Sequence, residues 1–172
     1  MMRGYFLLIV CLLLFSCKGN AQEKKKTDQS VSESLMEMNR LRVENETKRI
    51  NEFIQKHQYH MNRTSTGLRY EIYKQVDSKS PDSGNVIEIN YRIFLLDGTL
   101  CYSSDSTGPA KLRIGSGEQV SGLEEGLRMM SPGDKARLIL PAHLAYGMSG
   151  DRHRIPPGQA LFYDLEMLSD SK

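Results

Sequence analysis

Apolar and polar residues alternate between residues 87 and 93, within the segment 86–95, and this is the clearest pattern in the chain. Alternation with a period of two predicts a β-strand that buries one face. The side chains on the face predicted to be buried are Ile87, Ile89, Tyr91, Ile93 and Leu95. Residues 96–99 follow with the sequence Leu-Asp-Gly-Thr, and the Asp-Gly step favours a tight hairpin. We therefore expect the chain to turn back directly after this strand.

Two later segments, residues 137–140 and residues 161–167, are predicted to form further strands. In the second of them, the residues predicted to share a face are Leu161, Tyr163, Leu165 and Met167. One short helix is predicted to begin at Ser121, which has capping-box spacing to Glu124. The apolar residues of this helix recur at helical spacing and are Leu123, Leu127 and Met130. A Pro-Gly step at residues 132–133 ends the helix. These elements predict an α+β fold in which a single helix lies against an antiparallel, strongly twisted sheet.

A longer amphipathic helix is predicted before this domain, over residues 35–61. Its apolar stripe consists of Met36, Val43, Ile50, Ile54, His57 and Met61. These positions lie on one side of a helix with 3.6 residues per turn. Two interpretations of the stripe stay open, a helix docked on its own domain and a helix that pairs with a second copy. The domain is predicted to cover residues 62–172, and the chain to be a monomer or a weak dimer through this helix.

The N-terminal end has the features of a targeting segment, and residues 1–16 are predicted to be a lipoprotein signal peptide. Arg3 supplies the positive start, and an apolar run follows that is too short to span a bilayer as a helix. The end of the run resembles the bacterial lipobox, which implies lipidation at Cys17. The alternative is an ordinary secretory signal with a chance cysteine. Residues 17–34 are rich in Lys, Gln, Ser, Thr and Glu and are predicted to form a flexible tether.

Composition excludes several classes of function. Removal of residues 1–16 takes away Arg3 and no acidic residue, which leaves 22 basic residues against 21 acidic ones. A nearly neutral chain offers no electrostatic basis for binding nucleic acid. Of the three cysteines, only Cys101 lies beyond the predicted signal peptide and the lipidation site. No disulfide framework is therefore expected. The four histidines lack close acidic or cysteine neighbours, and neither a metal site nor a cofactor is expected.

Residues 66–168 are similar to the FKBP-type peptidyl-prolyl isomerase domain. The motifs that carry the resemblance are TGLRYEIYK, VIEINYRIFLLDGTLCYSS, IGSGEQVSGLEEGLRMMSPGDKARLILP, LAYG and IPPGQALFYDLEML, in the order of the family. The resemblance implies an antiparallel half-barrel wrapped on one helix, with an active cup between them. The chain as a whole also resembles the gliding-motility-associated FKBP-type lipoproteins of gliding bacteria.

The resemblance also implies the residues of the cup. The catalytic candidates are Tyr91, Val120, Tyr146, Ile155 and Tyr163, and the further substrate-binding candidates are Cys101, Tyr102 and Leu123. The Val120 amide is expected to donate a hydrogen bond to a substrate carbonyl. The Tyr146 hydroxyl is expected to donate a hydrogen bond at the rim of the cup. Cys101 and Tyr102 stand where the family commonly has a Phe-Asp pair, and Ala110 replaces a frequent pocket phenylalanine. We expect Tyr102 to remain able to give a hydrogen bond.

Two functions follow from these expectations. The first is a peptidyl-prolyl cis-trans isomerase anchored to the cell envelope, on the outer membrane facing the periplasm, with proline-containing exported or envelope polypeptides as partners and a possible part in gliding motility. The second is a non-catalytic, proline-recognising binding module or chaperone in an envelope complex. The altered residues Cys101, Tyr102 and Ala110 keep the second alternative open.

Overall fold

The computed structural model describes residues 20–171, and the chain divides into two compact units, residues 1–45 and residues 46–172. Helix α2 comprises Asn20–His57. The later elements are β1 (Asn62–Arg63), β2 (Arg69–Lys74), β3 (Val86–Leu95), β4 (Leu100–Ser103), α3 (Ser104–Thr107), β5 (Ala110–Arg113), α4 (Ser121–Leu127), β6 (Lys135–Leu140), η1 (Ala142–Leu144) and β7 (Leu161–Ser171). The predicted signal peptide and Cys17 lie outside the described residues.

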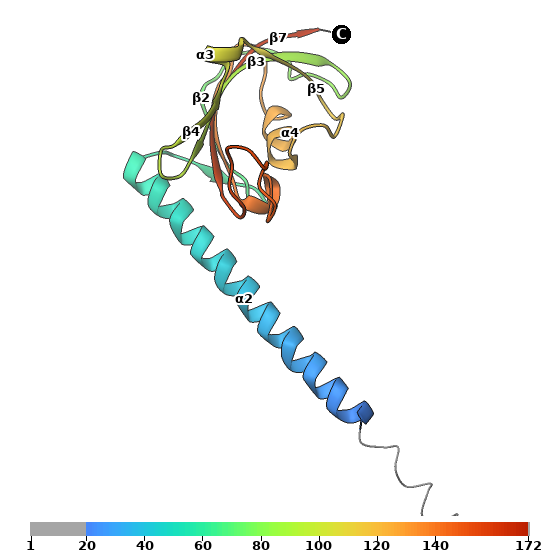
Figure 1. Ribbon diagram of the computed structural model, residues 1–172. Coiled ribbons are helices and arrows are strands. Elements are labelled where there is room, and N and C mark those ends of the chain that lie inside the picture. The colour runs from blue at the N-terminus through green and yellow to red at the C-terminus, as the bar shows by residue number, and fades with distance from the viewer. Residues whose placement is uncertain (1–19, 172) are drawn as a thin grey trace, which may run out of the picture. The chain divides into compact units, whose positions relative to one another are not determined.

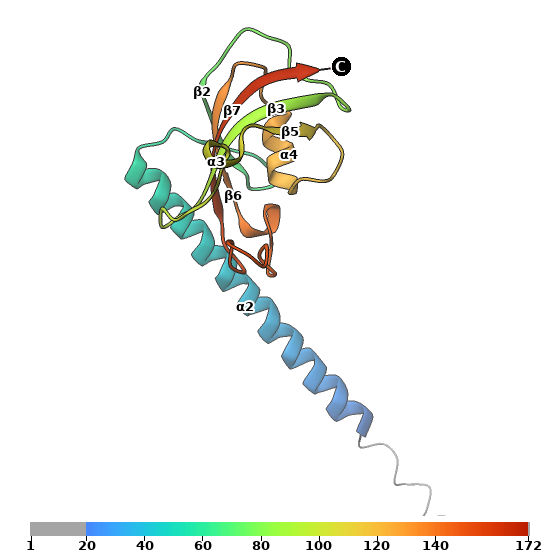
Figure 2. The same cartoon turned by 45° about the horizontal axis from the view of Figure 1, so that its top comes forward.

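One antiparallel sheet organises the second unit (Figure 1). The strands follow the order β1-β2-β6-β7-β3-β4, and β5 pairs with β3 beside β4. The C-terminal strand β7 is central, because it pairs with β6 on one side and with β3 along its whole length on the other. The sheet curves around α4, and the same arrangement is visible after rotation (Figure 2). The predicted α+β architecture is thereby confirmed.

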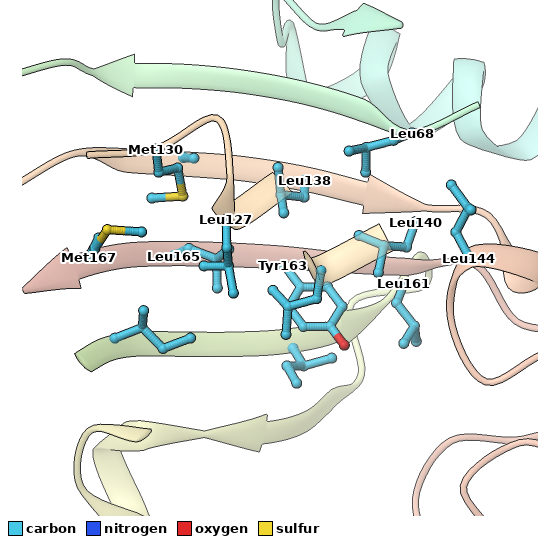
Figure 3. Close-up of a cluster of buried hydrophobic side chains, with 14 of the residues drawn as sticks. Leu68, Leu127, Met130, Leu138, Leu140, Leu144, Leu161, Tyr163, Leu165 and Met167 are labelled. Atoms are coloured by element: carbon cyan, nitrogen blue, oxygen red, sulfur yellow. The ribbon is translucent and has the colours of Figure 1, made fainter. Parts of the chain in front are cut away.

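The core lies between the sheet and α4, and the alternation of the sequence builds it. The four alternate residues of β7 that were predicted to share a face are all buried there, as are Leu127 and Met130 (Figure 3). Tyr91 and Leu95, at the predicted core positions of β3, are only partly buried. Met130 lies beyond the end of α4, since the helix stops three residues earlier. The period-two pattern therefore identified the buried face of the sheet correctly.

The opposite face of the sheet carries a second apolar cluster, which the last turns of α2 cover. Its buried members are Ile50, Phe53, Ile139, Ala160 and Phe162. The Phe53 and Phe162 rings lie with their centroids 5.3 Å apart. The buried carboxylate of Glu46 accepts a hydrogen bond from the Ala142 amide at 2.7 Å. The folded unit consequently begins near residue 46, whereas the sequence placed the domain boundary at residue 62.

Helix α2 differs from its prediction at both ends. It begins at Asn20, so residues 20–34 are helical where a flexible tether was predicted, and it ends at His57. Glu, Lys and Gln, which are frequent in this segment, have good helix propensity, and no Gly or Pro interrupts it after residue 19. The predicted stripe is not uniformly buried: the side chain of Met36 is 65% exposed, whereas that of Ile50 is 2% exposed. Ile50 belongs to the apolar cluster of the second unit, and this contact accounts for its burial.

Helix α4 sits unusually close to the sheet and begins differently from its prediction. Val120, not Ser121, is the N-cap, and no side chain caps the helix. The Glu124 carboxylate instead accepts the Gly115 amide at 2.9 Å, which explains why the capping box does not form. Gly126 allows the close approach, since a Cβ atom there would lie 2.3 Å from Cδ1 of Leu138. The helix is thus fixed against β6 with no space for a side chain between them.

Candidate functional site

A cavity of about 230 Å³ opens between α4 and the concave face of the sheet. Strands β3, β4, β5 and β7, the loop before α4, α4 itself and the loop after η1 all contribute to its wall. The lining residues are Ile89, Tyr91, Ile93, Tyr102, Ala110, Leu112, Gln119, Val120, Leu123, Tyr146, Tyr163 and Leu165. We call this cavity the tyrosine cup, because four of these side chains are tyrosines and most of the others are aliphatic.

The tyrosine cup brings together six of the eight candidate residues. They are Tyr91, Tyr102, Val120, Leu123, Tyr146 and Tyr163. Gln119 is a lining residue that the sequence did not reveal, since it lies in a loop without periodicity. Ala110 lines the cup as well, and its small side chain leaves room beside β5. The family motifs therefore located the cup, although they did not give its complete wall.

Cys101 and Ile155 do not line the cup, contrary to their predicted role as contact residues. Both are buried in the core, with 1% and 3% of their surface exposed. The Cys101 sulfur lies 3.8 Å from the carbonyl oxygens of Thr99 and Arg154. Burial raises the pKa of this thiol, so the thiol stays protonated at neutral pH. These two residues belong to the buried core cluster that also contains Leu123 and Tyr163 of the cup.

Two donors of the cup have no partner within the part of the chain that the structure describes. They are the Tyr146 hydroxyl and the Val120 amide. The amide of an N-cap residue has no acceptor inside its own helix, so α4 leaves it available. Burial raises the pKa of Tyr146, and the nearby Asp151 and Tyr91 add to this effect. Tyr146 is therefore a neutral donor at physiological pH.

Tyr163 and Tyr91 form parts of the wall with different surroundings. Tyr163 is 1% exposed, and burial raises its phenol pKa so far that the group does not ionise near neutral pH. The Tyr91 hydroxyl lies 3.3 Å from Oγ1 of Thr107, in the short helix α3. The cup thus offers apolar ring surface with no group that ionises near pH 7 on its lining, because its lining contains no acidic, basic or histidine residue.

Asp151 is a residue beside the cup that sequence reasoning missed. Its Oδ2 atom accepts a hydrogen bond from the Tyr102 hydroxyl. This bond raises the pKa of Tyr102 to about 12. The Tyr102 hydroxyl already donates its hydrogen bond to this carboxylate. It is therefore not free to donate to a substrate, as was expected. No local pattern could have revealed the pair, since the two residues are 49 positions apart.

The other hollows of the second unit are less suited to a ligand. One of about 200 Å³ is polar, and its charged residues are already paired: Arg92 with Asp105 at 2.9 Å, and Lys135 with Glu166 at 3.1 Å. Another, of about 340 Å³, lies beside Phe53 and the β3–β4 hairpin and is rimmed by charged side chains. The tyrosine cup is distinguished by unpaired donors set in apolar walls, as ligand sites usually are.

Within the described residues, no three His, Cys, Asp or Glu side chains gather closely enough to hold a metal ion. In the same part of the chain, no helix has the length and apolar character needed to cross a membrane.

Comparison with known proteins agrees with this geometry. Residues 77–168, more than half of the chain, match the family model of the FKBP-type peptidyl-prolyl cis-trans isomerases. FK506-binding protein 4 of Dictyostelium discoideum is 39% identical over 104 residues, which are 60% of this chain and 28% of that protein. FK506-binding protein 1B of Aspergillus fumigatus is 35% identical over 59% of this chain and 92% of its own length.

A solved structure extends the similarity beyond the matched domain. The crystal structure of FkpA from Escherichia coli superposes with a TM-score of 0.66 at 28% identity, and the match covers 90% of this chain and 74% of FkpA. The chain therefore belongs to the family of FKBP-type peptidyl-prolyl cis-trans isomerases.

Proposed function

We propose that the tyrosine cup accelerates cis-trans isomerisation of Xaa-Pro bonds. The observation that carries the proposal is an apolar cavity with two unpaired donors, the Val120 amide and the Tyr146 hydroxyl, and no ionising group on its lining. Bond rotation needs neither a nucleophile nor a proton transfer. A site of this composition suits such a reaction better than hydrolysis or group transfer, which require reactive side chains.

The chemistry follows from the electronic structure of the amide bond. Rotation breaks amide resonance and crosses a barrier of roughly 18–20 kcal/mol. In the twisted state the carbonyl and nitrogen lose conjugation, and the group becomes less polar. An apolar, water-poor wall therefore stabilises the twisted state relative to the planar one. A thousandfold acceleration requires about 4 kcal/mol of such selective stabilisation.

Each part of the cup has a role in this mechanism. Tyr91, Tyr163 and Leu123 supply the apolar surface that holds the pyrrolidine ring. The Val120 amide and the Tyr146 hydroxyl bind carbonyl oxygens next to the proline, so that rotation is confined to one bond. These two groups orient the substrate and do not transfer protons, because a neutral phenol and an amide do not exchange protons readily near pH 7.

The test is the exchange rate of a short Xaa-Pro peptide, measured by NMR with the full chain. Tyr146→Phe removes the hydroxyl and keeps the ring, so kcat/KM is expected to fall about 3- to 10-fold. Tyr73→Phe is the matched control, because the Tyr73 hydroxyl donates to Asp164 at 2.9 Å away from the cup. This control is expected to stay within about twofold of wild type. A folded wild-type protein that does not accelerate exchange would refute the proposal.

A non-catalytic proline-binding module is the second candidate. The observation in its favour is that the Tyr102 hydroxyl is already bonded to Asp151 and offers the substrate no free donor at this position. Cells that lack the gene can be complemented with wild type, with Tyr146→Phe and with further variants of the cup. Rescue by a folded variant that binds a proline peptide but does not catalyse exchange would favour the binding module.

We also propose that the chain is anchored to the cell envelope through lipidated Cys17, with the domain in the periplasm and exported polypeptides as clients. The lipobox-like end of the predicted signal peptide supports the anchor, and the whole-chain resemblance supports a role in gliding motility. The intact mass of the membrane-extracted protein tests the anchor, since acylation adds a large and defined increment. An unmodified Cys17 in that fraction would contradict it.

Self-association through α2 is a further proposal, and exposed apolar residues between positions 31 and 43 support it. They include Leu35, Met36, Met38 and Val43, each more than half exposed. Only scattered positions contribute, so a weak dimer is expected rather than a stable one. Sedimentation at increasing concentration tests this proposal, and a monomer at every concentration would refute it.

A further inference from the structure

We propose that Asp151 is a positioning residue that joins the loop before Ile155 to the wall of the tyrosine cup. The proposal rests on the proposed function of the cup, which it deepens. A carboxylate reaches Tyr102 from a segment that lies 49 residues later in the chain.

One oxygen of Asp151 organises the loop. The Oδ1 atom accepts hydrogen bonds from the backbone amides of His153, Arg154 and Ile155 at 2.8, 3.0 and 2.7 Å. The Asp151 amide in turn donates to the Ile155 carbonyl at 3.1 Å. Residues 151–155 are therefore closed into a compact turn around a single carboxylate oxygen.

The backbone before Asp151 is built for this turn. Gly150 has a φ of +63°, and a Cβ atom there would lie 2.3 Å from the carbonyl oxygen of Ile155. The contact is with backbone, which cannot move aside as a flexible side chain can. A glycine is needed at this position because any larger residue would open the turn.

The other oxygen of Asp151 fixes the turn to β4. The Oδ2 atom accepts the Tyr102 hydroxyl, and Tyr102 lines the cup. Arg154 adds a second attachment, since its Nη1 atom donates to the Cys101 carbonyl at 2.8 Å and its guanidinium lies 5.5 Å from the centroid of the Tyr102 ring. The turn is thus attached to two consecutive residues of β4. The Asp151 carboxylate is bonded both to the backbone of the turn and to Tyr102 of β4.

The charge of Asp151 strengthens this link. Burial raises the pKa of the carboxyl, but the Tyr102 hydroxyl and the three backbone amides outweigh it and hold the pKa at about 2. The group is therefore ionised at neutral pH, and hydrogen bonds to an ionised acceptor are stronger than neutral ones. The buried Ile155 is the last residue of this turn, so Asp151 controls the position of the loop without lining the cup itself.

The test compares Tyr102→Phe, Asp151→Ala and the double variant in the full chain. The first readout is hydrogen exchange of the Ile155 amide, which bonds to Asp151 and not to Tyr102. Loss of the Tyr102 hydroxyl is expected to speed this exchange at least threefold, since the carboxylate loses its anchor on β4. An exchange rate within a factor of two of wild type would overturn the proposal, whatever the activity.

The second readout is kcat/KM for a proline peptide. Expected losses are about fivefold for Tyr102→Phe and about 20-fold for Asp151→Ala, and the double variant is expected to match Asp151→Ala. Losses that multiply to about 100-fold would mean that the residues act independently, which overturns the proposal. If Asp151→Ala does not fold, Asp151→Asn replaces it in the same cycle, because its amide oxygen can still accept the three backbone amides.

Asp97→Asn is the matched control. Asp97 also accepts a backbone amide in a tight turn, from Thr99 at 2.8 Å, but it does not line the cup. The kcat/KM of the Asp97→Asn variant is expected to stay within about twofold of the wild-type value. Faster Ile155 exchange in Tyr102→Phe, together with an inactive wild type, would support the positioning role and refute only the proposed catalysis.

Discussion

Because α4 packs very closely against the sheet at Gly126, we can predict the effect of Gly126→Ala quantitatively. In a solvent-exposed helix this substitution would stabilise by up to about 1 kcal/mol, because alanine has the higher helix propensity. Here the new Cβ would lie 2.3 Å from Cδ1 and 3.1 Å from Cδ2 of Leu138. Carbon atoms pack best at roughly 3.5–4.0 Å, so the overlap with Cδ1 exceeds about 1 Å.

Overpacking of this kind costs typically 1–3 kcal/mol, which outweighs the gain in propensity. Leu138 cannot simply turn away, since it is 1% exposed and packed on all sides. We expect a net destabilisation of about 1–2 kcal/mol and a fall in Tm of about 4–8 °C. Movement of α4 would also shift Leu123, so kcat/KM for a proline peptide should decrease in the folded variant.

Urea denaturation followed by circular dichroism measures the effect. Ser121→Ala is the control on the same helix: Ser121 is exposed and caps nothing, so its stability should stay within about 0.5 kcal/mol of wild type. Adding Leu138→Val to Gly126→Ala should recover about 1 kcal/mol relative to the sum of the two single changes. A Gly126→Ala variant as stable as wild type would refute the argument from close packing.

Two further predictions concern the end of α2 and the turn at Asp151. Phe53→Ala should destabilise the domain by about 3 kcal/mol in urea denaturation, because Phe53 packs on Phe162; a loss below about 1 kcal/mol would show that α2 is not part of the folded unit. The folded-state pKa of Asp151 is lowered from 3.8 to about 2, so its contribution is complete above about pH 4 and disappears as the pH falls toward 2. The stability difference between wild type and Asp151→Asn should shrink over this interval, and a difference that is constant down to pH 2 would contradict the assignment.

Local patterns were sufficient for the strands β3, β6 and β7 and for the family. Alternation along a strand reports directly which side chains share a face, because successive residues of an extended chain point in opposite directions. This is why Tyr163 and Leu165 were placed correctly in the core. The motifs around Val120 and Tyr146 are contiguous and keep the order of the family, so they indicated most of the cup without any knowledge of contacts.

The same patterns failed where a residue's environment depends on a distant segment. The helical stripe of α2 did not reveal that Ile50 is buried and Met36 is exposed, because the periodicity is the same in both places. The capping box at Ser121 had the right spacing, but Glu124 found a partner at Gly115 instead. In each case a tertiary contact competed with a local preference and prevailed.

By itself, the sequence determined the strands β3, β6 and β7, the buried face of β3 and β7, and the family. Each of these depends on residues close together in the chain. Only the tertiary structure decided that Asp151 accepts a hydrogen bond from the Tyr102 hydroxyl, that Cys101 and Ile155 are buried in the core, and that the folded unit begins near residue 46. The physical reason is that hydrogen bonds and burial depend on distance in space, and spacing along the chain does not encode which distant groups the fold brings together.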